Sequence, residues 1–250
     1  MRMVVAGGTG VVGRHVVDLA RAAGHAVVPL ARSTGQDVVA GTGLAEALAG
    51  ADVVSDVTSV PTTSTKKSVG FFRAATEHLL AAEQAAGVGH HVALSIVGID
   101  AETSGYYAGK VEQERLVTAG PVPWTLLRAT QFHEFAAQLV ERASVGPFVL
   151  VPAARTATIA AAEVAETLVA LAAGSARGRA PDLAGPEEAE LADLVRRYLA
   201  ATGRRRRVLR LPLPGAAGKR MREGVLLPGP GAHRGGPTFD EWLARSELRA

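Results

Sequence analysis

The chain has 250 residues, of which 48% are hydrophobic, and its 27 basic and 24 acidic side chains give a formal charge of +3. This composition predicts a globular protein with a large core, and the absence of cysteine excludes disulfides and thiolate metal sites. Because no apolar run approaches the length of a membrane-spanning helix and the first strand begins almost at once, we expect a cytoplasmic protein with no membrane partner.

The first predicted elements are a strand, a glycine-rich loop and a helix. The apolar run over residues 3–6 leads into Gly7, Gly10 and Gly13, and helical spacing of apolar residues continues to Ala23. The first glycine permits a sharp turn, the second lets backbone N–H groups approach a pyrophosphate, and the third lets the helix pack closely on the strand. The predicted cofactor-binding residues of this loop are Gly7, Thr9, Gly10, Val11, Val12 and Gly13.

Apolar runs typical of buried parallel strands then alternate with helical segments. Strands are predicted over residues 3–6, 26–30, 52–57, 91–97 and 124–127, with a short edge strand over 37–39. Helices are predicted over residues 11–23, 44–49, 69–86 and 106–118. This order indicates an α/β fold with a Rossmann-like, doubly wound parallel sheet, which forms a core of residues 1 to about 135.

The rest of the chain is less regular. Helices are predicted over residues 134–143, 161–173 and 187–201, and extended segments over 148–151 and 208–211. We interpret residues 136–250 as a small C-terminal cap that binds a small-molecule substrate and is interleaved with the core in a single domain. The basic run Arg204–Arg207 lacks interleaved aromatic residues and is interpreted as a solvated turn, so we expect no nucleic-acid partner.

The residue after the second strand indicates which dinucleotide suits the loop. A carboxylate at this place accepts hydrogen bonds from the adenosine ribose of an unphosphorylated cofactor. This chain has no carboxylate there and instead has Arg32, which lies 19 residues after Gly13. Because a guanidinium suits a 2′-phosphate, we predict that the cofactor is NADP(H). The alternative is that Arg32 is an exposed loop residue without a ligand.

Tyr106 and Lys110 are four residues apart in a predicted helix and therefore share one face. A phenol is a poor acid or base at neutral pH, and a nearby ammonium is expected to lower its pKa towards a useful range. The spacing favours a catalytic pair over a surface helix or a core tyrosine. Tyr107 is the competing candidate for the acid, since it reaches the same site if the helix begins one residue later.

Thr58 and Ser59 are further candidates for the site, whereas the histidines are not. Thr58 and Ser59 follow the strand 52–57 at the edge of the sheet where ligands bind, so we expect them to border the cofactor, although a simple turn is the alternative. The seven histidines show no metal-ligand spacing, and we expect no metal. A homodimer is left open.

The chain resembles the short-chain dehydrogenase/reductases, and more narrowly their atypical, extended-type, NmrA-like NAD(P)H-binding members of actinobacterial type. The resemblance covers nearly the whole chain. It is carried by the glycine loop, the Tyr106–Lys110 motif, and the segments His90–Gly98, Pro123–Phe132 and Thr238–Leu243.

The resemblance implies a Rossmann domain with a substrate cap, in which NADP(H) serves the reduction of a small carbonyl or unsaturated compound. It implies that Tyr106 protonates the developing alkoxide, that Lys110 holds the nicotinamide ribose and that Ser95 orients the substrate. It also implies that Ala129 and Phe132 flank the nicotinamide. The alternative for Ser95 is a strand residue that bonds to backbone. The alternative functions are an NADP(H)-binding redox sensor without turnover and an NADP-dependent isomerase or epimerase.

Overall fold

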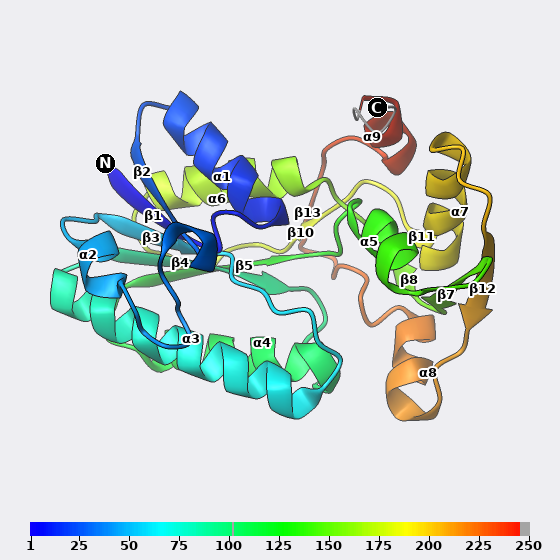
Figure 1. The fold of residues 1–250 in the computed structure, drawn as a ribbon, viewed down its shortest axis with the longest axis horizontal. Coiled ribbons are helices and arrows are strands. Elements are labelled where there is room, and N and C mark those ends of the chain that lie inside the picture. The colour runs from blue at the N-terminus through cyan, green and yellow to red at the C-terminus, as the bar shows by residue number, and fades with distance from the viewer. Residues whose placement is uncertain (102, 246–250) are drawn as a thin grey trace. The chain divides into compact units, whose positions relative to one another are not determined.

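The computed structural model describes residues 1–101 and 103–245 (Figure 1). The chain forms two compact units. The first comprises Met1–Arg128 and Ala162–Pro181, and the second comprises Ala129–Ala161 and Asp182–Ala250. None of the described helices is long and apolar enough to cross a membrane.

The first unit is built on a parallel sheet with the strand order β5-β4-β3-β1-β2, and β9 lies beside β5. The strands are β1 (Arg2–Ala6), β2 (Ala26–Leu30), β3 (Val53–Asp56), β4 (His90–Ile96), β5 (Trp124–Ala129) and β9 (Gly178–Arg179). The order reverses between β1 and β3, and ligands of such sheets bind at the carboxyl ends of the strands that flank this reversal. The predicted Rossmann-like fold is confirmed.

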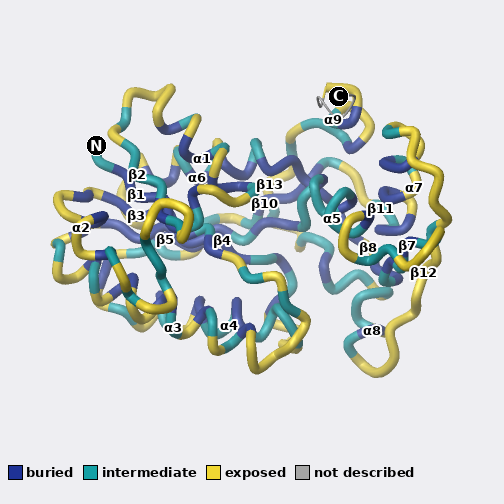
Figure 2. Tube along the Cα trace, in the orientation of Figure 1, coloured by how far each residue is buried: buried dark blue, intermediate teal, exposed yellow. Residues whose placement is uncertain are grey.

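Helices cover both faces of this sheet. One face carries α1 (Val11–Ala22) and α6 (Ala161–Ala173), and the other carries α3 (Thr65–Ala86) and α4 (Gly105–Ala119), with α2 (Leu44–Leu48) beside α3 (Figure 1). A 3₁₀ turn, η1 (Arg32–Thr34), follows β2. The central strands are buried between these layers (Figure 2). Burial of side chains such as Val4, Leu30, Val54 and Leu79 in one cluster stabilises the unit.

The short edge strand predicted over residues 37–39 is wrong. Asp37 makes only an isolated antiparallel bridge to Thr42. Its carboxylate accepts the backbone N–H of Val39 at 2.8 Å, which is the local hydrogen bond of an Asx turn. The strand β2 is therefore the outermost strand of the first unit.

Pro29 explains why no further strand pairs with β2. The N–H of Ala26 donates to Met1 O, and Leu30 O accepts the N–H of Gly7, so these two residues direct their polar backbone groups towards β1. Alternation along the strand then directs Pro29 to the outer edge, where it has no N–H to donate. A proline in this position is tolerated only at the edge of a sheet.

Two helices begin away from their predicted starts. The helix α3 begins at Thr65, four residues before the predicted start, because the hydroxyl of Ser64 accepts the N–H of Lys67 and caps the first turn. The helix α7 begins at Leu191 instead of residue 187, because Ala189–Glu190 form a short strand that pairs with Arg155–Thr156.

The second unit has its own core, in which Val149, Val151, Val195 and Phe239 are buried. Its helices are α5 (Phe135–Arg142), α7 (Leu191–Ala201), α8 (Gly215–Glu223) and α9 (Phe239–Arg245). Its strands are β6 (Ser144–Val145), β7 (Phe148–Pro152), β8 (Arg155–Thr156), β10 (Leu183–Ala184), β11 (Ala189–Glu190), β12 (Arg207–Leu211) and β13 (His233–Arg234). The strands β12, β7 and β6 form a small sheet of their own.

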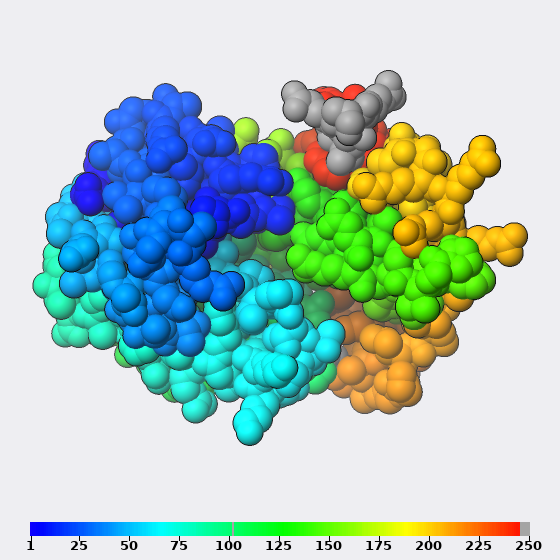
Figure 3. All heavy atoms as spheres, viewed as in Figure 1, coloured from blue at the N-terminus to red at the C-terminus, as the bar shows by residue number. Residues whose placement is uncertain are grey.

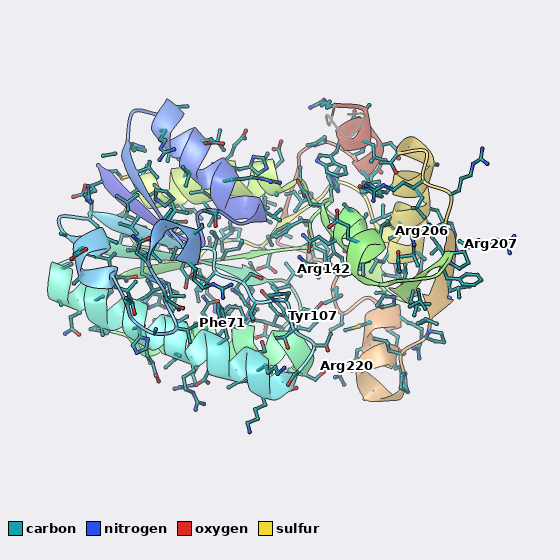
Figure 4. The ribbon with its side chains drawn as sticks, in the orientation of Figure 1. Phe71, Tyr107, Arg142, Arg206, Arg207 and Arg220 are labelled. Atoms are coloured by element: carbon teal, nitrogen blue, oxygen red, sulfur yellow. The ribbon has the colours of Figure 1, made fainter. Side chains whose placement is uncertain are left out.

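The basic run Arg204–Arg207 is an exposed segment that leads into β12, as predicted. Arg206 donates from its guanidinium to Gly146 O at 2.9 Å. Arg206 and Arg207 lie at the surface of the second unit, and the atoms of this part of the chain project into solvent (Figures 3 and 4).

Candidate functional site

Gly7 and Gly13 of the glycine loop have no room for a side chain. Gly7 has a φ of +81°, and a Cβ on it would lie 2.9 Å from Val57 O. A Cβ on Gly13 would overlap Gly7 O, so the first turn of α1 rests directly on the loop. Gly10 is the N-cap of α1 and contributes no side-chain cap. The first N–H groups of the helix therefore point outward without acceptors from the helix itself, which suits a phosphate.

The exit of β3 lies beside this loop. Val57 donates its N–H to Ala6 O at 3.0 Å, and a Cβ on Gly7 would lie 3.1 Å from Thr58 Cα. The hydroxyl of Thr58 is buried and has no hydrogen-bond partner among the described residues. A buried hydroxyl without a partner is unfavourable, so a polar ligand atom at this position would be stabilised.

The exit of β2 lies on the other side of the loop. The N–H of Gly7 donates to Leu30 O at 2.9 Å, and the next turn carries Arg32. The side chain of Arg32 is exposed. Arg32 therefore follows β2, the strand next to the glycine loop, and its contact with a 2′-phosphate stays a prediction.

Tyr106 lies in the first turn of α4 and is held by α3. A Cβ on Gly109 would overlap Ser68 Oγ and would lie 2.5 Å from the ring of Phe72, so the two helices approach closely at this glycine. Ser68 donates its hydroxyl to Tyr106 O at 2.8 Å, and the rings of Phe72 and Tyr106 pack edge to face at 5.6 Å. This packing role of Gly109 was missed, although the residue stands inside the Tyr106–Lys110 motif.

The phenol of Tyr106 contacts a serine from the exit of β3. Its oxygen lies 3.0 Å from Ser59 Oγ. The two residues are 47 positions apart in the sequence, and both were predicted to belong to the site. Tyr107 lies next along α4, with its ring 6.3 Å from that of Tyr106 (Figure 4).

The pKa of Tyr106 is raised above its ordinary value. Burial disfavours the phenolate, the hydrogen bond with Ser59 opposes this only in part, and the carboxylate of Asp56 adds to the increase. The structure therefore contradicts the expectation that Lys110 lowers this pKa. The reason is that the ammonium of Lys110 is directed towards other partners.

Lys110 is 3% exposed and is surrounded by acceptors from the protein. Its Nζ donates to Leu94 O at 2.5 Å and to the side-chain oxygen of Gln113. It also lies 4.8 Å from the ring centre of Phe72. Burial lowers the pKa of Lys110 to about 8, although the carboxylates of Asp56 and Glu114 favour the ammonium.

Asp56 and Gln113 were not singled out from the sequence. The amide of Gln113 donates to Asp56 Oδ2 at 2.7 Å, and Asp56 Oδ1 accepts the N–H of Thr58 at 2.9 Å. Both residues are buried. An available signal was the carboxylate at the end of the apolar strand β3, because an acid in such a run needs a polar partner.

Ser95 lies inside β4 rather than in the loop after it. It is buried beside Glu114 and, together with Arg128, helps to hold the pKa of that carboxyl below its usual value although burial would raise it. Arg128 donates to Glu114 at 2.7 Å and to Asp100 at 2.9 Å. The serine hydroxyl in contact with Tyr106 thus belongs to Ser59.

Ala129 and Phe132 lie in the second unit. Ala129 pairs with Leu183, and Phe132 forms an isolated parallel bridge with Ile159. Their place at the nicotinamide stays a prediction.

His91 of β4 and Glu83 of α3 form another buried polar pair in the first unit. His91 Nδ1 is 2.9 Å from a carboxylate oxygen of Glu83, and both side chains are fully buried. Burial alone would lower the pKa of His91, but the Glu83 carboxylate outweighs this effect and raises it. The neighbouring His90 has a lowered pKa because of burial. No group of three acidic or histidine side chains among the described residues is arranged to hold a metal ion.

Several solved structures share the fold of this chain. The structure is similar to that of a dTDP-4-dehydrorhamnose reductase from Bacillus anthracis in complex with NADP (TM-score 0.74, 12% identity, 98% of this chain and 97% of the other). It is also similar to a Thermus thermophilus UDP-glucose 4-epimerase in complex with NAD (TM-score 0.68, 20% identity, 98% and 92%). A third is a short-chain dehydrogenase/reductase superfamily protein from Agrobacterium tumefaciens with bound NAD (TM-score 0.68, 19% identity, 98% and 95%).

The TM-scores show a common fold. No curated protein matches the sequence significantly. Residues 7–174, which begin in the glycine loop and include Tyr106 and Lys110, match the family model described as NAD(P)H-binding. The chain therefore belongs to the NAD(P)H-binding family and has the Rossmann-like fold of the short-chain dehydrogenase/reductases.

Proposed function

We propose that this protein is an NADP(H)-dependent oxidoreductase that reduces a small carbonyl or unsaturated compound. The observation that carries the proposal is the contact of Tyr106 with Ser59, because it brings an acid onto the ligand-binding edge of the sheet beside the glycine loop.

The residues present fit a dinucleotide. Gly7 and Gly13 let the loop pack against the exit of β3 and the start of α1 without a clashing Cβ, and the uncapped start of α1 supplies N–H donors for the pyrophosphate. The buried hydroxyl of Thr58, at the same edge, has no hydrogen-bond partner in the described part of the chain. Arg32 would hold the 2′-phosphate of the adenosine ribose.

The reaction requires a hydride and a proton. The reduced nicotinamide, when bound, supplies the hydride. Tyr106 would donate its phenolic proton to the oxygen on which negative charge develops, and the raised pKa keeps this phenol protonated at neutral pH. The Ser59 hydroxyl fixes the orientation of the phenol.

Replacing Tyr106 with phenylalanine is expected to lower turnover about 100-fold to 10,000-fold, the usual contribution of a general acid. Oxidation of NADPH with a panel of carbonyl compounds measures this effect. Tyr107→Phe is the matched control and should leave turnover within about threefold of the wild type. The reverse result for the two variants would assign the proton to Tyr107.

Replacing Arg32 with alanine is expected to weaken NADPH binding at least about tenfold, because a hydrogen bond to a charged group contributes about 1.5–3 kcal/mol. Binding of NADH should hardly change, since NADH has no 2′-phosphate. Cofactor fluorescence titrations give both constants, and Arg21→Ala, an exposed arginine of α1, is the control. Tighter binding of NADH than of NADPH by the wild type would contradict the proposed cofactor.

A second candidate function is an NADP(H)-binding redox sensor without turnover. It is favoured by the Lys110 ammonium, which donates to Leu94 O and to the side-chain oxygen of Gln113, and by the position of Ser95 within a strand. A sensor would bind NADPH and would show no Tyr106-dependent turnover with any compound of the panel.

A further inference from the structure

The carboxylate of Asp56 connects the two segments that form the site, the exit of β3 and the helix α4. Asp56 Oδ1 accepts the N–H of Thr58 at 2.9 Å, and the following residue, Ser59, contacts the phenol of Tyr106. Asp56 Oδ2 accepts the amide of Gln113 at 2.7 Å. The exit of β3 and the helix α4 are therefore both tied to the same side chain.

The hydrogen bonds of Gln113 have a defined polarity. Its NH₂ group faces the Asp56 carboxylate, and its carbonyl oxygen accepts from the Lys110 ammonium. If the amide were reversed, its donors would face the ammonium and its oxygen would face the carboxylate, so the two charged neighbours favour the observed orientation. The hydrogen bonds thus join the carboxylate of Asp56, the amide of Gln113 and the ammonium of Lys110, in that order. All three side chains are buried.

Because Lys110 is buried, its ammonium depends on the hydrogen bonds that link it to Gln113 and Asp56. A buried ammonium needs acceptors and a compensating negative charge. The charged and titratable groups that act on it are Asp56 from β3, Glu114 from α4 and His91 from β4, while α3 contributes the ring of Phe72. Glu114 is already engaged by Arg128, which leaves Asp56 as the carboxylate linked to the lysine through a hydrogen-bonded bridge.

We propose that Asp56 is a positioning residue that acts through Gln113 to hold the Lys110 ammonium in place, and that it also fixes the Thr58–Ser59 segment against which Tyr106 rests. The positioning role does not depend on the proposed hydride transfer. Only the use of Lys110 in the reaction rests on that proposed function. Tyr106 contacts Ser59, the neighbouring Thr58 donates its N–H to Asp56, and Asp56 is linked through Gln113 to Lys110. This path ties the motif in α4 to the exit of β3.

The test is a direct titration of Lys110 by NMR. The chain contains four lysines, so protein labelled with ¹³C at lysine Cε gives four signals, and Lys110→Met identifies the one of interest. In the wild type its midpoint is expected at about pH 8. Asp56→Asn keeps the shape of the side chain and removes its charge, and the midpoint should move at least about one pH unit lower.

Two further variants complete the test. Gln113→Met keeps the side-chain volume and breaks the bridge, so it too should lower the midpoint in a protein with wild-type circular dichroism. The control is Asp52→Asn, an exposed carboxylate at the other end of β3 that accepts the N–H of Arg2. It should leave the midpoint unchanged. An unchanged Lys110 midpoint in folded Gln113→Met or Asp56→Asn would overturn the proposal.

Activity provides a second, separate readout. If turnover needs the Lys110 ammonium, the alkaline limb of kcat/KM should move to lower pH in Asp56→Asn together with the NMR midpoint. A midpoint that moves in a protein without turnover would reject the proposed reaction and keep the positioning role. Turnover with an unmoved midpoint would keep the reaction and reject the positioning role.

Discussion

Replacing Gly13 with alanine is expected to destabilise the protein by about 3 kcal/mol and to weaken NADPH binding about 100-fold. The added Cβ would overlap Gly7 O, so α1 must move away from the loop. That movement would also displace the N–H groups predicted to hold the pyrophosphate, and each lost hydrogen bond to a charged group costs about 1.5–3 kcal/mol. Urea unfolding and fluorescence titration with NADPH measure the two effects.

Two other glycines separate these effects. Gly10→Ala should weaken NADPH binding with a smaller loss of stability than Gly13→Ala, because its φ of −78° suits alanine and its Cβ would lie 3.2 Å from Gly7 O, a tight contact that a small shift relieves. A Cβ added at Gly70 in α3 would meet open space. Gly70→Ala should therefore stabilise the helix by about 0.5–1 kcal/mol without an effect on binding. A Gly13→Ala variant as stable as the wild type would show that the loop is not packed as described.

Replacing Glu83 with glutamine is expected to destabilise the protein by about 3 kcal/mol near pH 6, because it removes one partner of a buried ion pair. The cost should fall as pH rises. The pKa of His91 is raised in the folded protein, so its protonation stabilises the fold below its unfolded pKa of about 6.5, and this contribution is lost as pH passes the folded value. Unfolding in urea at about pH 6 and about pH 9 measures the difference.

The control for this variant is Glu77→Gln on the exposed side of the same helix, which should change stability by less than about 0.5 kcal/mol at either pH. Histidine NMR gives a second check, because His91 should titrate above and His90 below the ordinary value. A pH-independent cost for Glu83→Gln would argue against a charged pair.

The sequence was most informative where one local pattern determines the structure. The strand, glycine loop and α1 could be predicted because turn and close approach depend on residues that are near in the chain. The fold was predicted from the alternation of apolar runs with helical segments, and the family from this loop, the Tyr106–Lys110 spacing and three further segments. Ser59 and Tyr106 were each predicted to belong to the site, and the structure brings them into contact.

The direction of the Lys110 side chain could not be predicted in the same way. Helical spacing places Tyr106 and Lys110 on one face, but it does not say which acceptor the ammonium will choose. That choice depends on Asp56, which is 54 positions away, and on the approach of α3 at Gly109. The edge strand over residues 37–39 was wrong for a related reason: β propensity counts less than whether a neighbouring edge can accept a strand.

Pro29 has a consequence for association between molecules. An open edge of a sheet offers a row of unpaired N–H and C=O groups that can recruit a strand from another chain. Pro29 interrupts that row on the outer side of β2, one residue before the strand ends. Strand addition, domain swapping and fibrillar growth are therefore disfavoured along this edge.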